Sequence, residues 1–307
     1  MKNTFTFCFI AFSLSSLFAQ QQIGNSNMEA WDNIGAATEE PTNWNGIKTA
    51  SGNAFFISFA PQAVSRSTDT PSGSGYSARL ETQSALGIPA NGTMTCGRIN
   101  VGSATVADPS NYSWSETGDS LFSETLTDMP DSIVWWAKFE AADPAHLARM
   151  KATLHDDYDY RDPEDATSLT HIVGNAIENY GSTGQWERHA VAIDYSGPAT
   201  DHTHILVTFT TNQTPGVGTI GDYVLIDDVQ LIYNSTIGVD ELNTTFFTYY
   251  STENGLTISG NETLYEVFNL SGQQLKFGSA TELNGLKLNS GIYIVKSSSR
   301  SEKVLVP

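Results

Sequence analysis

Two adjacent aspartates occupy the centre of a segment that otherwise has the composition of a buried β-strand. Residues 222–233 read "DYVLIDDVQLIY", and the residues around the pair are mostly β-branched, aliphatic or aromatic. Side chains alternate between the two faces of a strand, so Asp227 shares an apolar face with Leu225 and Val229, and Asp228 lies on the other face. Burying a lone carboxylate is costly. We therefore expect Asp227 to be neutralised by a bound cation, an arginine or several backbone N–H donors.

A second group of carboxylates lies in the segment "HDDYDYRDPED" at residues 155–165, which holds six acidic residues and two tyrosines. The segment lacks the central glycine and the distal glutamate of an EF-hand calcium loop. Tyr158 and Tyr160 could instead stack on sugar rings, while Asp157 and Asp159 accept hydrogen bonds from sugar hydroxyls. The alternative is a solvated acidic loop without a ligand.

The residues around three tryptophans predict a loop position for one of them and core positions for the other two. Trp44 follows Pro41 and precedes Asn45 in a predicted loop, so its indole is a further candidate for contact with a neutral glycan. Trp31 and Trp186 lie within strand patterns and are expected in the core.

Motifs of catalysis are missing from the sequence. It contains no G-x-S-x-G, no H-E-x-x-H and no glycine-rich phosphate loop. A glycosidase, however, needs only two carboxylates about 5–10 Å apart, which a sequence motif does not reveal. We therefore favour a non-catalytic carbohydrate-binding protein. A glycan-active hydrolase or lyase, and a structural or adhesive surface protein, are kept as alternatives.

The N-terminus indicates export. Residues 1–19, "MKNTFTFCFIAFSLSSLFA", combine one lysine, a short apolar run and a small final residue, as a secretory signal peptide does. No later apolar run approaches the roughly 18 residues that a transmembrane helix needs. We expect a protein that is secreted or held at the outer-membrane surface.

Charge narrows the range of partners. Residues 20–239 hold 27 acidic and 9 basic side chains, and residues 240–307 hold 7 and 5. An acidic chain of this kind is unsuited to nucleic acids and anionic membranes, because phosphate binding needs clustered Lys and Arg. It is compatible with divalent cations and with neutral glycans.

The pattern of elements predicts an all-β fold. Many short alternating runs, among them residues 54–60, 149–155 and 202–211, are separated by clusters of Gly, Pro, Asn, Asp and Ser. We expect a jelly-roll-type antiparallel β-sandwich over residues 20–234, followed by a linker and a small β-sandwich over residues 235–307.

The C-terminal region resembles a known export signal. The segments "YEVFNLSGQ" (265–273), "LNSGIYIV" (288–295) and "KVLV" (303–306) resemble, in order, three elements of the type A C-terminal sorting domain of Bacteroidetes. This resemblance covers about residues 240–307. It implies a small β-sandwich that the type IX secretion machinery recognises as its partner.

The two ends of the large region resemble carbohydrate-binding jelly rolls. "NSNMEAWDNIGAATEEPTNWNG" (25–46) is similar to their opening strand, and "YVLIDDVQL" (223–231) to their closing strand. With a sorting domain behind it, the arrangement also resembles the carbohydrate metabolism domain of Bacteroidetes surface proteins. In such sandwiches Ca²⁺ is often held between the first and last strands. The resemblance implies Glu29 and Asp227 as ligands, with Asp228 in reserve, and a hydrogen-bonded aspartate without metal stays the alternative.

Overall fold

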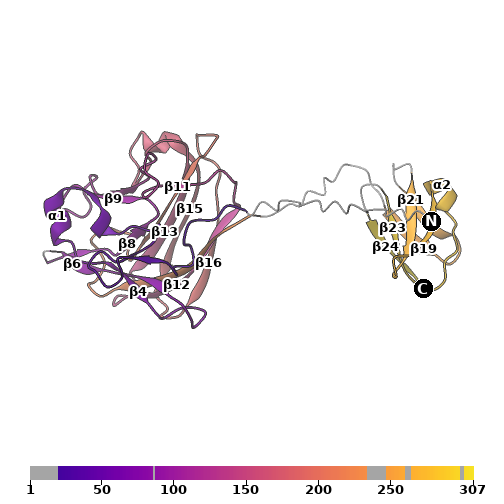
Figure 1. Cartoon of the computed structure of the whole chain (residues 1–307), viewed down its shortest axis with the longest axis horizontal. Helices are drawn as coiled ribbons and strands as arrows, with labels where there is room; N and C mark the ends of the chain where they lie inside the picture. The colour runs from indigo at the N-terminus through magenta and orange to yellow at the C-terminus, as the bar shows by residue number, and fades with distance from the viewer. Residues whose placement is uncertain (1–19, 86, 234–246, 260–263, 298–300) are drawn as a thin grey trace, which may run out of the picture. The chain divides into compact units, whose positions relative to one another are not determined.

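The computed structural model describes residues 20–85, 87–233, 247–259, 264–297 and 301–307, and the chain forms two compact units that divide between residues 234 and 235 (Figure 1). We call them unit 1 and unit 2. The expected signal peptide at residues 1–19 and the start of the linker lie outside the described residues. Within the described ranges, no helix is long and apolar enough to cross a membrane.

Unit 1 is a sandwich of two antiparallel five-stranded sheets, which confirms the predicted fold class. The first sheet has the order β16 (Glu187–Ala192), β12 (Ser132–Glu140), β18 (Tyr223–Ile232), β5 (Ser77–Glu81) and β4 (Val64–Ser67). The second has the order β11 (Glu124–Thr125), β17 (His204–Thr210), β13 (Leu147–His155) and β15 (Ile172–Gly181), with β8 (Thr93–Thr95) also paired to β17.

Strict alternation in the second sheet gives it one apolar and one polar face. Met150, Phe209 and Met94 are neighbours across β13, β17 and β8, and all three are fully buried. They pack in the core that the two sheets share, where Trp135 of β12 meets Phe209 with ring centroids 6.0 Å apart. The residues between them along each strand point the other way and are mostly polar.

A third, smaller sheet packs against this polar face. Its order is β14 (Arg161–Asp162), β10 (Tyr112–Trp114), β9 (Arg98–Val101) and β3 (Ser51–Gly52). Tyr160, which precedes β14, is fully buried against Leu206 of β17 and Ile172 of β15. The remaining strands of unit 1 are short: β1 (Trp31–Asp32), β2 (Glu40–Pro41), β6 (Gln83–Ala85) and β7 (Ile88–Ala90).

The few helices of unit 1 correct one detail of the prediction. They are η1 (Ile47–Thr49), α1 (Ala54–Phe59) and η2 (Ser168–His171). Residues 54–60 were expected as a strand, but the segment begins with Asn53, whose side chain accepts the N–H of Phe55 at 3.0 Å and caps the helix. A run of six residues is too short and too uniformly apolar for its periodicity to distinguish the two structures.

Trp31 is buried as expected, but Trp186 is not. Trp186 precedes β16, an edge strand of the first sheet, and its side chain is only half-buried. Its indole N–H donates to Asp69 at 2.9 Å. The predicted strand is present as β16, but Trp186 lies just before it at the edge of the sheet, and its ring stays outside the core.

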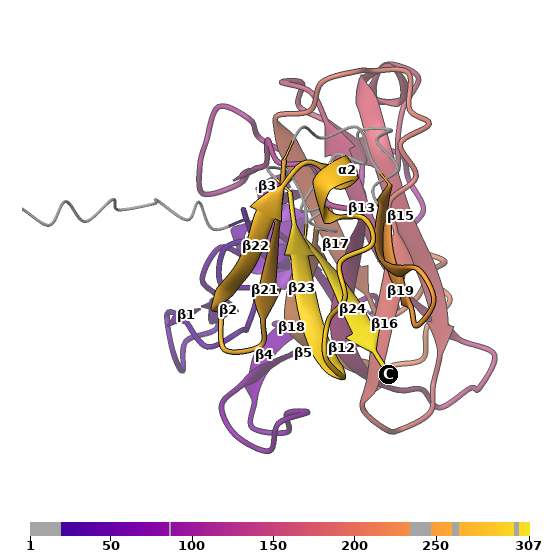
Figure 2. The ribbon, with the colours of Figure 1, turned by 90° about the vertical axis from the view of Figure 1, so that its right-hand side faces the viewer.

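Unit 2 is a small β-domain around a four-stranded antiparallel sheet (Figure 2). The sheet has the order β22 (Gln274–Gly278), β21 (Tyr265–Asn269), β23 (Gly291–Lys296) and β24 (Ser301–Val306). The pair β19 (Phe247–Ser251) and β20 (Gly255–Ser259) and the short helix α2 (Ala280–Leu283) complete it. Tyr265, Val267 and Val295 are fully buried in its core. Gly272, with φ +80°, allows the tight reversal between β21 and β22.

Candidate ligand-binding site

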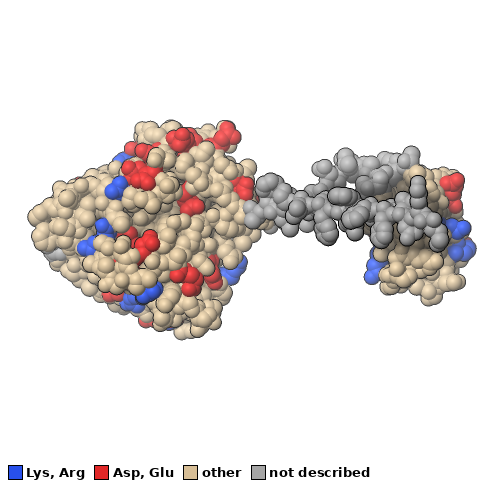
Figure 3. All heavy atoms as spheres, viewed as in Figure 1, with Lys and Arg blue, Asp and Glu red and all other residues tan. Residues whose placement is uncertain are grey.

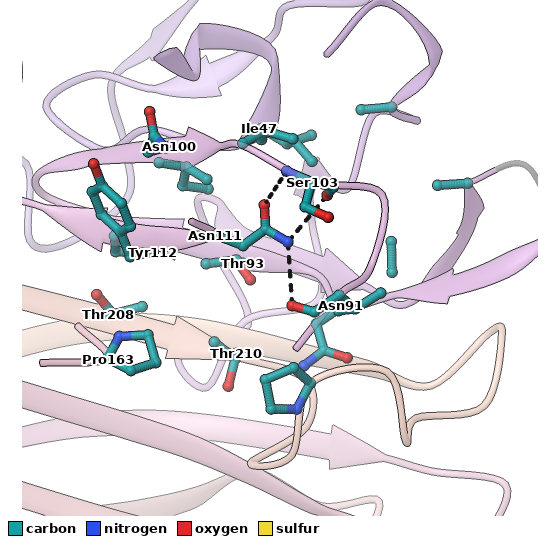
Figure 4. A pocket seen from close by; sticks show the side chains of 18 of the residues that line it. Ile47, Asn91, Thr93, Asn100, Ser103, Asn111, Tyr112, Pro163, Thr208 and Thr210 are labelled. Atoms are coloured by element: carbon teal, nitrogen blue, oxygen red, sulfur yellow. Dashed lines mark hydrogen bonds between the residues drawn. The ribbon is translucent and has the colours of Figure 1, made fainter. Parts of the chain in front are cut away.

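A pocket of about 410 Å³ lies in unit 1 between the polar face of the second sheet and the small third sheet (Figure 4). Its floor comes from cross-strand neighbours of the second sheet. Arg149 pairs with Thr210, and Thr210 pairs with Thr93, so the three side chains form one row. Thr208 lies two residues back on the same face. Alternation therefore produces a hydrogen-bonding floor directly behind the apolar core.

The wall of the pocket is largely apolar. Helix α1 contributes Phe56 and Phe59, and Phe59 is 50% exposed at the opening. Further apolar side chains come from η1, β7, β9 and the loop after β9: Ile47, Ile88, Ile99, Val101 and Val106. Phenylalanine rings can pack on the C–H faces of a ligand, while the threonine floor offers hydroxyl groups.

One loop of the wall is held in shape by a single side chain. Asn111 Oδ1 accepts the backbone N–H groups of Gly102 and Ser103 at 3.0 and 3.1 Å. Its Nδ2 donates to the carbonyls of Ser103 and Thr105 at 3.1 and 2.9 Å. Figure 4 shows Asn111 beside Ser103 in the wall of the pocket. The loop is thus fixed before any ligand arrives, which lowers the entropy lost on binding.

A cluster of paired charges closes one end of the pocket. Arg149 donates two hydrogen bonds to Asp162, at 2.9 and 3.1 Å. Lys151, only 3% exposed, contacts Asp162 at 3.0 Å, the hydroxyl of Tyr160 at 3.1 Å and the carboxylate of Glu164. Tyr160 in turn donates to Glu164 at 2.9 Å. Two cations and two carboxylates therefore balance each other.

The pKa values in this cluster follow from the pairing. Burial opposes ionisation of Asp162, but hydrogen bonds and charge from Arg149 and Lys151 outweigh it and lower its pKa. Burial also opposes ionisation of Glu164. The hydrogen bond and the charge from Lys151 outweigh this effect and lower the pKa of Glu164. Burial raises the pKa of Tyr160, which stays protonated. Both carboxylates are ionised and engaged, and neither resembles the protonated general acid that glycoside hydrolysis requires.

None of the five residues predicted to contact a glycan lines this pocket. Tyr160 is fully buried in the ion cluster, because its loop folds back onto the second sheet. Trp44 is 1% exposed, since its ring packs 5.9 Å from Phe209 and its N–H donates to the carbonyl of Gly24 at 3.1 Å. Those two predictions are wrong.

The rest of the acidic loop is more accessible. Asp157 and Asp159 are exposed, and Asp159 accepts two hydrogen bonds from Thr117, at 2.9 Å from its N–H and 2.8 Å from its hydroxyl. Tyr158 is half-buried and stacks on His171, with ring centroids 4.0 Å apart and planes 8° from parallel. One face of the Tyr158 ring is thus covered by a histidine.

The predicted metal position shows a buried carboxylate near other charges. Asp227 is 4% exposed, and its Oδ1 accepts the N–H of Asp228 at 2.8 Å. Burial raises the pKa of Asp227 to about 7, and repulsion from Asp228 and Glu29 adds to the effect. The carboxylate of Glu29 accepts the N–H of Tyr76 at 3.0 Å. In the described part of the chain, no group of three or more His, Cys, Asp or Glu side chains is arranged to hold a metal.

The sequence did not predict the pocket, although the alternating pattern of the strands that form its floor is visible there. The alternating segments at 93–95, 149–155 and 204–210 place threonines and basic residues opposite methionine and phenylalanine. That pattern could have identified the floor as a covered polar face. The wall depends on α1 and on contacts between distant segments, which no local pattern shows.

Comparison with known proteins concerns the fold. No family model and no curated protein sequence matches the chain. Among solved structures, a candidate glycoside hydrolase from Bacteroides thetaiotaomicron is 18% identical over 71% of this chain and 72% of its own, with a TM-score of 0.51. A family 61 carbohydrate-binding module in complex with β-1,4-galactotriose is 11% identical over 67% of this chain and 90% of its own, with a TM-score of 0.29. A family 28 module specific for non-crystalline cellulose is 8% identical over 62% and 87%, with a TM-score of 0.33. At 18% identity, the first likeness shows a similar fold alone, and the class of unit 1, a β-sandwich, follows from its own two sheets.

Asp227 should make the protein less stable as the pH rises. The folded state keeps the Asp227 proton up to about pH 7, whereas an unfolded aspartate releases it near pH 4. The free energy of unfolding therefore falls between about pH 4 and about pH 7. In EDTA, we expect Asp227→Asn to raise the melting temperature at about pH 8 and to change it little at about pH 4. The exposed control Asp201→Asn should show no such difference, and a variant less stable than wild type at pH 8 would contradict the assignment.

Proposed function

We propose that unit 1 is a non-catalytic carbohydrate-binding domain and that the pocket of α1, the second sheet and the third sheet is its binding site. The observation that carries the proposal is the two-sided lining. Phe56 and Phe59 contribute apolar ring surface, and Thr93, Thr208 and Thr210 contribute hydroxyl oxygens. The O–H of Thr208 donates to Thr95 and that of Thr210 to the carbonyl of Asn212, so these two oxygens are left to accept hydrogen bonds. A sugar ring has the matching pair of surfaces, because its C–H faces are apolar and its edge carries hydroxyl groups.

Charge favours a neutral sugar. The charged residues that line the pocket, Arg149, Asp162 and Glu164, belong to the balanced cluster and leave no free cation to pair with an acidic ligand. Figure 3 shows Asp and Glu side chains scattered over the visible face of unit 1. An anionic ligand would therefore be repelled on approach and unpaired on arrival.

The same cluster argues against the alternative of a hydrolase or lyase at this site. Asp162 and Glu164 are carboxylates in a pocket, as hydrolysis would need, but lysine and arginine hold both in the ionised form. A structural or adhesive protein without a ligand would have no need of a preformed, mixed pocket. Binding is the function that the described residues support best.

The binding proposal predicts a role for Phe59. We expect the mature protein to bind at least one neutral glycan on an array. Phe59→Ala should weaken that binding by about 1–3 kcal/mol, because it removes an interfacial ring without disturbing a buried one. Phe277→Ala is the matched control, since Phe277 is 56% exposed in unit 2 while Phe59 is 50% exposed. Titration calorimetry measures both, and unchanged affinity of Phe59→Ala would place the site elsewhere.

Calcium binding beside Asp227 is a second part of the proposal. A divalent cation would keep Asp227 deprotonated and reduce its repulsion with Asp228 and Glu29, the residues whose charges raise its pKa. Oxygen ligands of this kind suit Ca²⁺. Backbone carbonyls would have to supply further ligands.

We expect millimolar CaCl₂ to raise the melting temperature of the wild type at about pH 8, where Asp227 is already largely ionised and a cation need not displace its proton. Asp227→Asn should abolish the increase, and Asp201→Asn should retain it. Differential scanning calorimetry in CaCl₂ and in EDTA gives the comparison. An identical melting temperature in both solutions would remove the proposed ion.

Unit 2 is proposed to act as the sorting domain that the type IX secretion machinery recognises, which would leave the protein secreted or at the outer-membrane surface. Unit 2 has a hydrophobic core of its own, to which no residue of unit 1 contributes, and this supports a separate role for unit 2. Deleting residues 240–307 should leave unit 1 folded but retain it in the periplasm. Immunoblots of cell fractions, with circular dichroism of the truncated protein, test both parts. Normal amounts of the truncated protein outside the cell would refute the routing.

A further inference from the structure

Two polar atoms at the pocket are buried without a hydrogen-bond partner. They are Oδ1 of Asn91, a hydrogen-bond acceptor, and Nδ2 of Asn212, a donor. Both residues line the pocket, and Asn212 is only 3% exposed. Figure 4 shows Asn91 at the edge of the pocket beside the threonine floor. Trp114 and Trp135 also keep a buried ring N–H without a partner, but neither residue lines the pocket. Buried polar groups are nearly always paired in folded proteins, and only at the pocket could a ligand supply the missing partners.

The orientation of both amides is determined by their other atoms. Asn91 Nδ2 donates to the backbone carbonyl of Asn212 at 2.9 Å, which only the nitrogen can do. Asn212 Oδ1 accepts the N–H of Thr214 at 2.9 Å, which only the oxygen can do. The unpaired atoms are therefore an acceptor on Asn91 and a donor on Asn212, and a flip of either amide would break an existing bond. The first hydrogen bond also keeps the two residues next to each other.

We propose that Asn91 and Asn212 form an anchor for hydroxyl groups of a neutral, unmodified sugar. A hydroxyl can donate to Asn91 Oδ1, and the same hydroxyl or its neighbour on the ring can accept from Asn212 Nδ2. This inference rests on the proposed function and specifies its ligand. The apolar lining nearby, Ala90 and Pro215, suits the carbon skeleton of the same ring.

At the position of the bound hydroxyl, the anchor rejects two other groups, a carboxylate and a methyl ether. The carboxylate of a uronic acid has no hydrogen to donate to Asn91 Oδ1, and its charge would face that acceptor. A methyl ether can accept from Asn212 but cannot donate to Asn91, and its methyl group adds bulk at the buried end. Sites that hydrogen-bond a substrate hydroxyl discriminate strongly against analogues that lack it.

The test uses the mature protein and calorimetry with cellotriose, mannotriose and β-1,4-galactotriose, their O-methylated forms, and tri-galacturonate. The variant Asn212→Asp keeps the acceptor for Thr214 but replaces the unpaired donor with an acceptor of the same shape. We expect it to lose at least about tenfold in affinity for the trisaccharide that the wild type binds, as expected for one buried hydrogen bond. The control is Asn254→Asp, which adds the same charge at an exposed position of unit 2. It should bind the trisaccharide as the wild type does.

The outcomes separate the anchor from the site. If the wild type binds a neutral trisaccharide but Asn212→Asp binds it equally well, the anchor is wrong and the binding function stands. Equal binding of the O-methylated form by the wild type also overturns the anchor. Binding of tri-galacturonate in preference to all three neutral trisaccharides overturns the assignment of a neutral ligand, and neither comparison needs a variant to fold. If the wild type binds none of these probes and no neutral glycan on the array, the proposed function fails together with the anchor.

Discussion

The balanced ion cluster beneath the third sheet is the constraint on which the pocket depends. Lys151 is almost fully buried, and a buried charge is tolerated only when its partners surround it. Asp162 and Glu164 supply that pairing, and both come from the segment that contains and follows β14. Removing one partner would leave an uncompensated charge in the interior. The position of β14 relative to the second sheet is therefore tightly determined, and with it one end of the pocket.

The cluster can exist only because the second sheet is covered on both faces. In a two-layer sandwich, the residues opposite the core would face water, and a lysine there would be solvated at little cost. Here the third sheet covers that face, so Lys151 is paired while Thr208 and Thr210 retain access to the pocket. The added layer thus converts an ordinary solvent face into a site with hydrogen-bonding groups behind an apolar entrance.

Sequence reasoning succeeded where the physics is local and failed where it depends on distant contacts. Alternation predicted the β-sandwich, because the period of two acts within one strand. It was wrong about the face of Asp227, although that side chain is buried: Asp228 has φ +48° and the pairing of β18 with β12 shifts there, so Asp227 lies opposite Trp136 on the face away from Ile226 and the core. Trp44 was misplaced because its partner, Phe209, lies far along the chain. Tyr160 was misplaced because composition describes an acidic loop as solvated, while two basic residues on β13 bring it inside. The pocket needs several such contacts at once, and no single segment contains them.

The charges that line the pocket balance each other, although unit 1 as a whole is acidic. Unit 1 carries a strong negative charge, so anions are disfavoured during approach, over distances set by ionic strength. Within the pocket the charges cancel, and under the proposed binding function selection would pass to short-range groups such as Asn91 and Asn212, which ionic strength barely affects. Rejection of acidic sugars would thus have a long-range component that salt weakens and a contact component that salt leaves intact. Because salt separates the two, the discrimination that persists at high ionic strength belongs to the pocket itself.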